Sequence, residues 1–538
     1  MGIPSYFSYI VKKHSKIIRI FNKNCLKVNN LYLDSNSIIY DAVHNIDFTK
    51  LVESDVKTII QSVIRKIDEY IALIQPDTYI YIAFDGVAPV AKLEQQRERR
   101  YKSLYQAQIA KTIFKDTKPD PFNTTAITPG TKFMKELNKE IRSYYIDPKK
   151  YNVKNIILSL SDKVGEGEHK LFNFIRENPD YHKNSTSIIY GLDADLIMLS
   201  INHLPISDKI FLFRETPHFI KSINSELEPN ETYLMDIPEL ANVITLDMNN
   251  NIELTTEQQK NRIYDYIFLC FFLGNDFMPH FPSINIRTGG IDKMIMAYKA
   301  TIGSTNENLT DGKIIYWKNV RKIVKFLADQ EENYLKVETR FRDKKEKTTF
   351  FKTDTPDDVY KKFDAIPTYE RELEKYINPY KDGWQHRYYN VLFKEENNEE
   401  NKKQICINYL EALEWTMKYY TKGCADWRWC YSYSYPPLLS DLLQYIPYFD
   451  KEFIENKPSK PVNELVLLCY VLPEKCLNLL PDKLYNALIS SHKEWYSNDC
   501  EFIWAYCKYF WESHVQLPYI DIDTVSYTHL TLPTKRIV

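Results

Sequence analysis

Short runs of β-branched and aromatic residues alternate with longer stretches of helical periodicity from residue 1 to about residue 330. The runs are "LYLD" (31–34), "TYIYIAFD" (78–85), "NIILSL" (155–160), "SIIYGLDAD" (187–195) and "KIFLFR" (209–214). Strand-length runs separated by helical segments are typical of βαβ units. The pattern therefore predicts an α/β fold with a largely parallel, twisted sheet flanked by helices.

The pattern changes twice further along the chain. Residues 335–403 are more charged and less periodic, ending in "KEENNEENKK", which predicts a linker and surface loop. Helical periodicity resumes over 404–524, for example in "INYLEALEWTMKYY", and predicts a mostly helical region packed against the first. The last 14 residues, 525–538, resemble translated sequencing-adapter read-through and are left out of the fold prediction. The expected division is thus 1–334, 335–403, 404–524 and 525–538.

Composition limits the class of protein. The 538 residues carry a net charge of −2, so binding to nucleic acid would need a local basic patch. The nine cysteines are scattered without a C-x-x-C pair, which favours a reducing compartment over a disulfide framework. No signal-peptide pattern and no apolar run of about 20 residues is present. We expect a soluble, intracellular protein.

Acidic side chains follow the predicted strands. Asp34, Asp85, Asp193 and Asp195 come at strand ends, and Asp276 follows the apolar stretch "FLCFFLGN". The carboxyl ends of parallel strands meet at one edge of a sheet, so these acids should converge there. For any single one of them, turn formation or helix capping is the more common explanation.

Two further acids, Glu166 and Glu168, lie at a predicted helix start in "VGEGEHKLFNFIR". Acidic residues in a first helical turn are common, because the helix dipole favours them. Seven carboxylates at one crevice, however, would repel each other unless cations neutralised them. Two Mg²⁺ or Mn²⁺ ions about 4 Å apart are the usual device for cleaving a phosphodiester bond. The set therefore predicts a two-metal site.

A basic helical face is predicted directly after Asp85, in "GVAPVAKLEQQRERRYK". At helical spacing, one side of it carries Lys92, Gln96, Arg99 and Arg100, while Glu94 and Glu98 lie on the other side. A solvated charged surface is the alternative interpretation. The separation of charges by face, and the position beside a strand-end acid, favour a phosphate-binding role.

Several stretches resemble the 5′→3′ exoribonuclease (XRN) family, within the flap-endonuclease-like (PIN-like) nuclease superfamily. They are "MGIPSYF", "LYLDSNSIIYDAVH", "FDGVAPVAKLEQQRERR", "VGEGEHKLFNFIR", "YGLDADLIMLS", "FLCFFLGNDFMPHFPSINIRTGGID" and "WRWCYSYSYPPLLSDLL". They occur in family order over residues 1 to about 520. The resemblance makes 1–334 the catalytic nuclease region and 404–524 the second conserved region.

The resemblance also implies the roles of individual residues. The divalent metal ligands would be Asp34, Asp85, Glu166, Glu168, Asp193, Asp195 and Asp276. The 5′-monophosphate would bind Lys92, Gln96, Arg99 and Arg100. The first base would stack on Tyr40, which stands where the family usually has histidine, and on Trp427 or Trp429. A second departure is "SYPP", Ser434 to Pro437, where the family has "HYAP".

The resemblance implies a processive enzyme that hydrolyses 5′-monophosphorylated single-stranded RNA to mononucleotides with two Mg²⁺ or Mn²⁺ ions. We expect it to act as a monomer, in the cytoplasm rather than the nucleus, without a membrane partner. Two alternatives remain open at this point. One is a structure-specific, flap-type DNA endonuclease, and the other is a catalytically inactive RNA-binding or scaffold relative.

Overall fold

The computed structural model describes residues 3, 5–22, 26–46, 55–115, 122–216, 220–223, 225–229, 231–393, 398–455, 459–497 and 500–531. Its main sheet has seven strands in the order β1-β7-β6-β5-β2-β3-β4. Their bounds are β1 (Ile18–Ile20), β2 (Asn30–Asp34), β3 (Tyr79–Ala83), β4 (Asn155–Ser159), β5 (Ser187–Tyr190), β6 (Ile210–Phe213) and β7 (Tyr233–Asp236).

The five strands predicted from the sequence are the five parallel ones, β2 to β6, so the predicted fold class is confirmed. The antiparallel strands β1 and β7 extend the β6 edge and were not predicted. β1 has three residues, two of them exposed, which is too short to show an alternating pattern.

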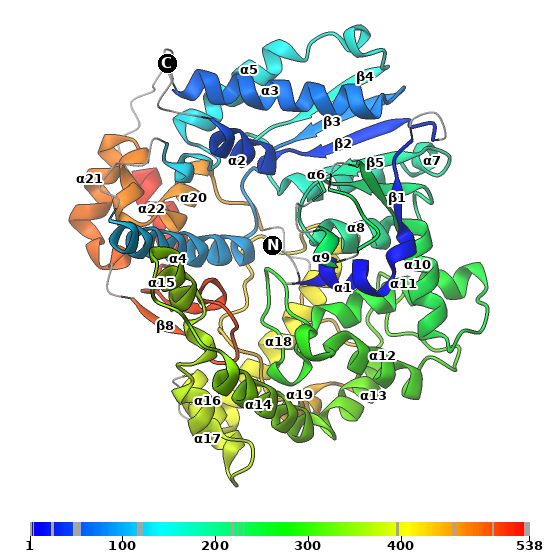
Figure 1. Cartoon of the computed structure of the whole chain (residues 1–538), viewed down its shortest axis with the longest axis vertical. Helices are drawn as coiled ribbons and strands as arrows, with labels where there is room; N and C mark the ends of the chain where they lie inside the picture. The colour runs from blue at the N-terminus through cyan, green and yellow to red at the C-terminus, as the bar shows by residue number, and fades with distance from the viewer. Residues whose placement is uncertain are drawn as a thin grey trace.

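Helices cover both faces of the sheet. Along β2, Leu31 and Leu33 face the core that includes α2, α3 and α5, while Tyr32 faces the core that includes α6, α8 and α11. This alternation is the two-residue period of a strand. Figure 1 shows α3 and α5 on one side of the sheet and α6 and α8 on the other. Helices of this part are α1 (Tyr6–Lys13), α2 (Asn36–Asn45), α3 (Asp55–Ile74), α4 (Val90–Phe114), α5 (Lys132–Tyr144), α6 (Gly167–Glu177), α7 (Pro179–His182), α8 (Asp195–His203), α9 (Ile220–Ile223), α10 (Ile237–Met248), α11 (Thr256–Phe271), α12 (Gly290–Thr301) and α13 (Trp317–Ala328).

The linker and loop predicted over 335–403 is wrong for most of that range, which is helical. It contains most of α14 (Glu331–Thr348), all of α15 (Pro356–Asp364), α16 (Glu372–Ile377) and α17 (Trp384–Leu392), and the start of α18 (Glu399–Thr421). Residues 394–397 lie outside the described residues. The polar composition led to the wrong prediction because some of the charged side chains are buried and paired with each other.

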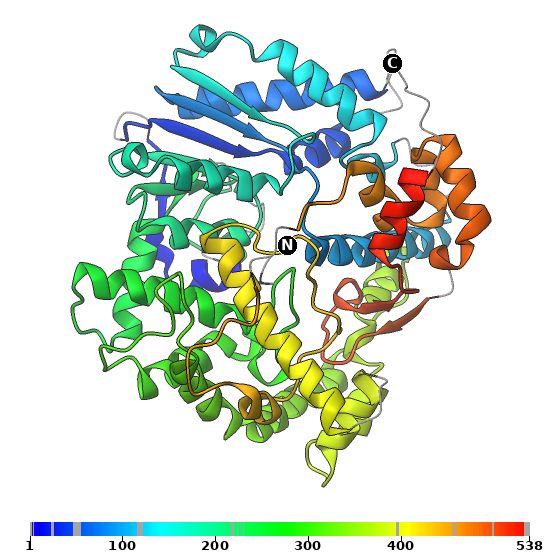
Figure 2. The same ribbon diagram turned by 180° about the vertical axis from the view of Figure 1, so that it is seen from behind.

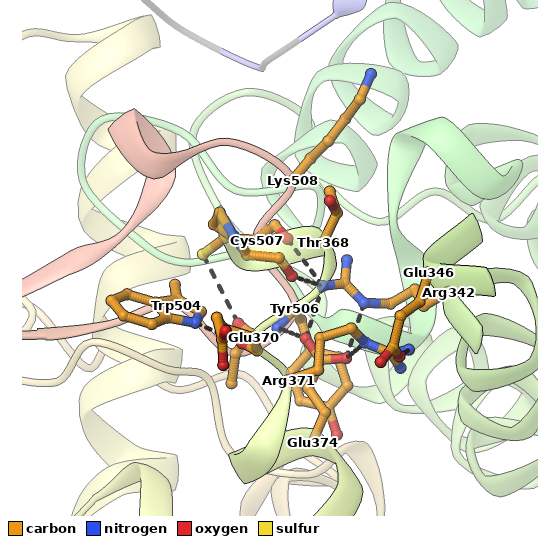
Figure 3. Close-up of polar contacts among 12 residues, drawn as sticks. Arg342, Glu346, Thr368, Glu370, Arg371, Glu374, Trp504, Tyr506, Cys507 and Lys508 are labelled. Atoms are coloured by element: carbon orange, nitrogen blue, oxygen red, sulfur yellow. Dashed lines mark hydrogen bonds and ion pairs between the residues drawn. The ribbon is translucent and has the colours of Figure 1, made fainter. Parts of the chain in front are cut away.

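An ion-pair cluster shows this internal charge (Figure 3). Glu374 is buried and accepts from Arg342 at 2.6 Å and from Arg371 at 2.7 Å. The cluster reaches the C-terminal part of the chain, because the Tyr506 backbone N–H donates to Glu374 and Arg342 donates to the Cys507 carbonyl. These charges join α14 and α16 to a distant segment rather than facing water.

The second region is helical, as predicted, with one small antiparallel hairpin of β8 (Glu501–Ile503) and β9 (His514–Gln516). Its further helices are α19 (Leu439–Tyr445), α20 (Glu464–Val471), α21 (Asp482–Ser491) and α22 (Ile522–Thr531). Figure 2 shows α18, in yellow, running across the back of the molecule towards the sheet. It packs against α8 and α11.

The tail 525–538 starts inside α22, where Val525 is buried, and residues 532–538 lie outside the described residues. None of the helices in the described ranges combines the length and apolar character needed to span a bilayer.

Candidate active site

Acidic side chains gather at the carboxyl edge of the sheet. Asp34 ends β2, Asp85 follows β3 and Asp193 follows β5, and these three strands are neighbours in the order β5-β2-β3. Together with Glu166 and Glu168 from the start of α6, they line a cavity of about 500 Å³. The sheet topology thus brings together residues that lie up to 159 positions apart in the sequence.

The glycine between the two glutamates explains the local sequence "GEGE". Gly167 begins α6, and its N–H donates to Asp85 at 2.6 Å. A Cβ at this position would lie 2.5 Å from Asp34 Oδ1, so any larger residue would displace the Asp34 carboxylate. Glycine therefore lets the helix start approach two strand-end carboxylates without displacing them.

Asn36 orients Asp85, a role that the sequence interpretation missed. Its Nδ2 donates to Asp85 Oδ2 at 2.6 Å, and its Oδ1 accepts from the Asp85 backbone N–H at 3.0 Å. The signal was present in "LYLDSN", since Asn36 begins α2 two positions after a strand-end acid.

Asp195 and Asp276 are buried next to the cavity rather than lining it, as far as the described residues show. Asp195 begins α8, and its N–H lies 3.4 Å from Asp193 Oδ1. Asp276 follows α11 and accepts from Lys92 and Gln95 at 2.5 and 3.2 Å. Five of the seven predicted acids therefore line the cavity, and the other two, Asp195 and Asp276, contact residues that line it.

Lys92 lies within this cluster. Its ammonium is 2.7 Å from Glu166 Oε2 and 2.5 Å from Asp276 Oδ2. Burial raises the pKa of Asp276, but nearby positive charges, of which Lys92 has the largest effect and Arg99 a smaller one, hold that pKa below its ordinary value. Lys92 thus neutralises two carboxylates and lines the cavity at the same time.

Three other acids of the cluster each have a buried oxygen atom without a hydrogen-bond partner among the described residues. Asp34 Oδ1, Glu168 Oε2 and Asp195 Oδ1 are buried and accept no hydrogen bond from the described residues. Burial raises the pKa of Glu168 well above its ordinary value, and Asp195 and Asp193 raise it further. Burial followed by repulsion from Asp85 and Asp193 does the same for Asp34. Buried carboxylates in this state need a cation or a proton.

The donor set fits a hard divalent cation, which prefers carboxylate oxygens. As they lie here, no three Asp, Glu, His or Cys side chains of the described ranges are arranged to hold one ion together.

The face of α4 carries the predicted phosphate ligands. Lys92, Gln96 and Arg99 line the cavity together with Tyr40 of α2. Arg100 does not line it in the described part of the chain. Its Nη1 is buried without a hydrogen-bond partner, and burial lowers the pKa of its guanidinium to about 10. On the other side of the helix, Glu94 accepts from Tyr470 of α20, so the acidic face is packed rather than solvated.

An aromatic stack links the second region to the acids. Trp429 lies on Trp415, Trp415 on Tyr419 and Tyr419 on His169, with ring centroids 5.2, 4.9 and 3.8 Å apart. Tyr419 also donates to Glu166 Oε1 at 2.9 Å. The sequence interpretation missed Tyr419, which lies in an ordinary amphipathic helical pattern.

The two predicted base-stacking tryptophans do not line the cavity in the described residues. Trp429 packs on Trp415 and donates to Glu411. The backbone carbonyl of Trp427 accepts from the Val90 N–H at the start of α4. Their stacking role stays a prediction, while Tyr40 is placed where it could contact a base.

An acidic cluster at the edge of a parallel sheet, next to a basic helical face, is the arrangement of a phosphodiester-cleaving nuclease. The family model described as "XRN 5'-3' exonuclease N-terminus" matches residues 1–216, and the one described as "Xrn1 helical domain" matches residues 257–366 and 353–532. The chain belongs to the XRN 5′-3′ exonuclease family.

Curated relatives agree with this assignment. The chain is 27% identical to a 5′-3′ exoribonuclease 2 homolog of Drosophila melanogaster over 97% of its length and 70% of the relative. It is 27% identical to 5′-3′ exoribonuclease 2 of Arabidopsis thaliana, spanning 66% of that protein, and 28% identical to 5′-3′ exoribonuclease 1 of Saccharomyces cerevisiae, spanning 40% of it. These alignments cover 97% and 89% of this chain. Among solved structures, it is similar to the catalytic core of Rad2 in complex with DNA substrate, at 16% identity and a TM-score of 0.32 over 67% of this chain and 79% of that one.

Proposed function

We propose that the chain is a processive 5′→3′ exoribonuclease that hydrolyses 5′-monophosphorylated single-stranded RNA to mononucleotides. The observation that carries the proposal is the shared cavity, which brings five carboxylates together with Lys92, Gln96 and Arg99 of one helix. A basic end pocket beside a cleavage site would make the enzyme act from the 5′ end. The names of its relatives support RNA as the substrate.

In this proposal, Lys92, Gln96 and Arg99 bind the terminal phosphate, because an ammonium, an amide and a guanidinium can donate to several of its oxygens. Arg100 joins them by turning towards the cavity. Tyr40 stacks on the first base, which places the next phosphodiester over the carboxylates. Trp427 or Trp429 would reach the other side of that base only after moving towards the cavity.

The acids Asp34, Asp85, Glu166, Glu168, Asp193, Asp195 and Asp276 would hold two Mg²⁺ or Mn²⁺ ions. Bound there, such ions supply an activated water and stabilise the leaving 3′ oxygen. Lys92 and Tyr419 keep Glu166 in place, and Asn36 does the same for Asp85.

The test follows one unstructured RNA, labelled at its 3′ end, with a 5′-monophosphate, a 5′-triphosphate or a 5′-hydroxyl, in Mg²⁺ or in EDTA. We expect rapid loss of the monophosphate RNA alone, and only with Mg²⁺. Equal decay of all three RNAs would contradict the end pocket. Cleavage of a flapped DNA instead of RNA would establish the endonuclease alternative.

Variants separate the parts of the site. The double change Asp193→Asn with Asp195→Asn should abolish decay, while Arg99→Gln should slow the monophosphate RNA and reduce the preference for it. Glu177→Gln is the matched control, since Glu177 lies at the end of α6 and pairs with Asn173 outside the cavity. RNA bound but not degraded by the wild-type protein would favour the inactive relative.

A further inference from the structure

Arg214 is a basic residue of the active-site cavity that lies outside the predicted phosphate pocket. It follows β6 directly, at the same edge of the sheet as the carboxylates, and it lines the cavity with Asp193 and Asp34. Its guanidinium makes no hydrogen bond or ion pair with the described residues, and its Nε is buried without a partner. A cation beside several carboxylates would ordinarily pair with one of them.

Phe7 of α1 holds Arg214 in place. The guanidinium carbon lies 3.9 Å from the centre of the Phe7 ring, and both side chains line the cavity. Contact with the ring face stabilises a cation without using its N–H groups. The donors of Arg214 therefore remain available to an anion, and phosphate oxygens are their best geometric match.

The surroundings of Arg214 leave its positive charge available to a phosphate. Burial lowers the pKa of Arg214, and the charge of the nearby Asp193 partly offsets this. No ion pair forms between these two residues in the described part of the chain. Arg214 thus keeps its own charge at the cavity without neutralising an acid.

Strand order separates Arg214 from the α4 pocket. β6 is followed by β5, β2 and β3, and α4 comes after β3. Three strand spacings amount to about 14 Å. The strand ends that precede Asp193 and carry Asp34 lie between, so Arg214 is separated along the sheet edge from the strand that precedes α4.

We propose that Arg214, seated on Phe7, binds the RNA phosphate that follows the scissile one, the third phosphate from the 5′ end. The inference rests on the proposed exonuclease function and deepens it. The strand would then be gripped on both sides of the scissile bond, by α4 on the 5′ side and by Arg214 on the 3′ side. Positive charge at both ends also offsets the repulsion between RNA and the acidic cluster.

The experiment compares two short RNAs that differ by this phosphate. The dinucleotide pNpN carries only the terminal and scissile phosphates, while the trinucleotide pNpNpN carries the third. Binding is measured by fluorescence anisotropy with Ca²⁺ in place of Mg²⁺, for wild type and for Arg214→Gln. We expect the variant to lose roughly 10- to 100-fold in affinity for pNpNpN, the range of a charge-assisted hydrogen bond, and little for pNpN.

Three further variants make the result specific. Phe7→Leu should lower the same preference several-fold while the charge remains. Arg99→Gln should weaken both RNAs equally, because both carry the terminal phosphate. Arg65→Gln, an exposed arginine of α3, should change neither.

Equal loss for both RNAs in Arg214→Gln, or no loss for either, would overturn the role of Arg214. Failure of the exonuclease proposal would look different. In that case the wild-type protein would leave 5′-monophosphorylated RNA intact in Mg²⁺, while the binding difference between the two RNAs would still report on Arg214.

Discussion

Tyr419 donates its phenolic hydrogen to Glu166 across 2.9 Å, although the two residues are 253 positions apart. Tyr419 is buried, and burial raises its pKa well above the ordinary value, so it remains a donor. The second region therefore takes part directly in positioning an acid of the nuclease region.

Tyr419→Phe should lower kcat about 10-fold or more with little change in KM, because substitutions that disorient a metal ligand cost roughly 10- to 100-fold. Loss of a buried hydrogen bond to a carboxylate should also lower the free energy of unfolding by roughly 1–3 kcal/mol. Steady-state RNA decay and urea unfolding measure both effects. Tyr409→Phe is the control on the same helix, since Tyr409 donates to the Pro279 carbonyl. Tyr409→Phe should lower the free energy of unfolding without changing kcat. If it lowers kcat as much as Tyr419→Phe does, the role of Tyr419 is packing and not the positioning of Glu166.

Glu168→Gln should stabilise the protein in EDTA and weaken its response to Mg²⁺. The charged form of Glu168 is disfavoured by burial and by Asp195 and Asp193, so the neutral amide removes repulsion. Wild type should gain about 2.7 kcal/mol from Mg²⁺ at 100 times its Kd, and the variant less at the same concentration. Thermal unfolding with EDTA or Mg²⁺ gives both values. An unchanged Mg²⁺ increment would remove Glu168 from the proposed metal site, and Glu177→Gln should behave as wild type.

Glu374→Gln should destabilise the protein by about 3–5 kcal/mol, because it leaves Arg342 and Arg371 buried without a full counter-charge. The effect should appear in urea unfolding as a lower midpoint. Glu372→Gln, two positions earlier and exposed, is the control and should change stability by less than about 0.5 kcal/mol. Similar losses in both variants would show that the cluster contributes no more than a surface charge.

Glu331 predicts a pH dependence of stability. It is buried and accepts from the Leu439 and Ser440 backbone N–H groups, and burial raises its pKa from 4.5 to about 8. The folded state therefore holds this proton to higher pH than the unfolded state. Its contribution to stability is complete below about pH 4.5 and is lost as the pH rises through 8. The slope from this group is at most about 1.4 kcal/mol per pH unit.

Glu331→Gln should flatten the decrease in unfolding free energy between pH 5 and 8, measured by urea unfolding at several pH values. Asp265 and Glu98, whose pKa values burial raises to about 7, keep part of the slope. Glu332→Gln changes the adjacent exposed residue and should leave the slope as in wild type. An unaltered slope in Glu331→Gln would show that Glu331 is ionised in the folded protein.

Local patterns predicted the five parallel strands, the acids at their ends and the shared face of Lys92, Gln96 and Arg99. Each of these depends on the residue pattern within a single strand or helix, and that pattern indicates which side chains the element buries and where it ends. The run "LYLD" predicted β2, whose first four residues are buried, and the helix expected from Ala91 onward begins at Val90.

These local patterns could not predict which side chains contact each other. Nothing near Lys92 in the sequence indicates that it contacts Asp276, and nothing near Glu166 indicates Tyr419. Arg342 and Glu374 lie in a charged stretch that resembles a solvated loop, and only the tertiary structure shows that they form a buried ion pair. A side chain's charge is local, but its partner is decided by which elements pack together, because long-range packing alone determines whether that charge faces water, a counter-charge or an aromatic ring.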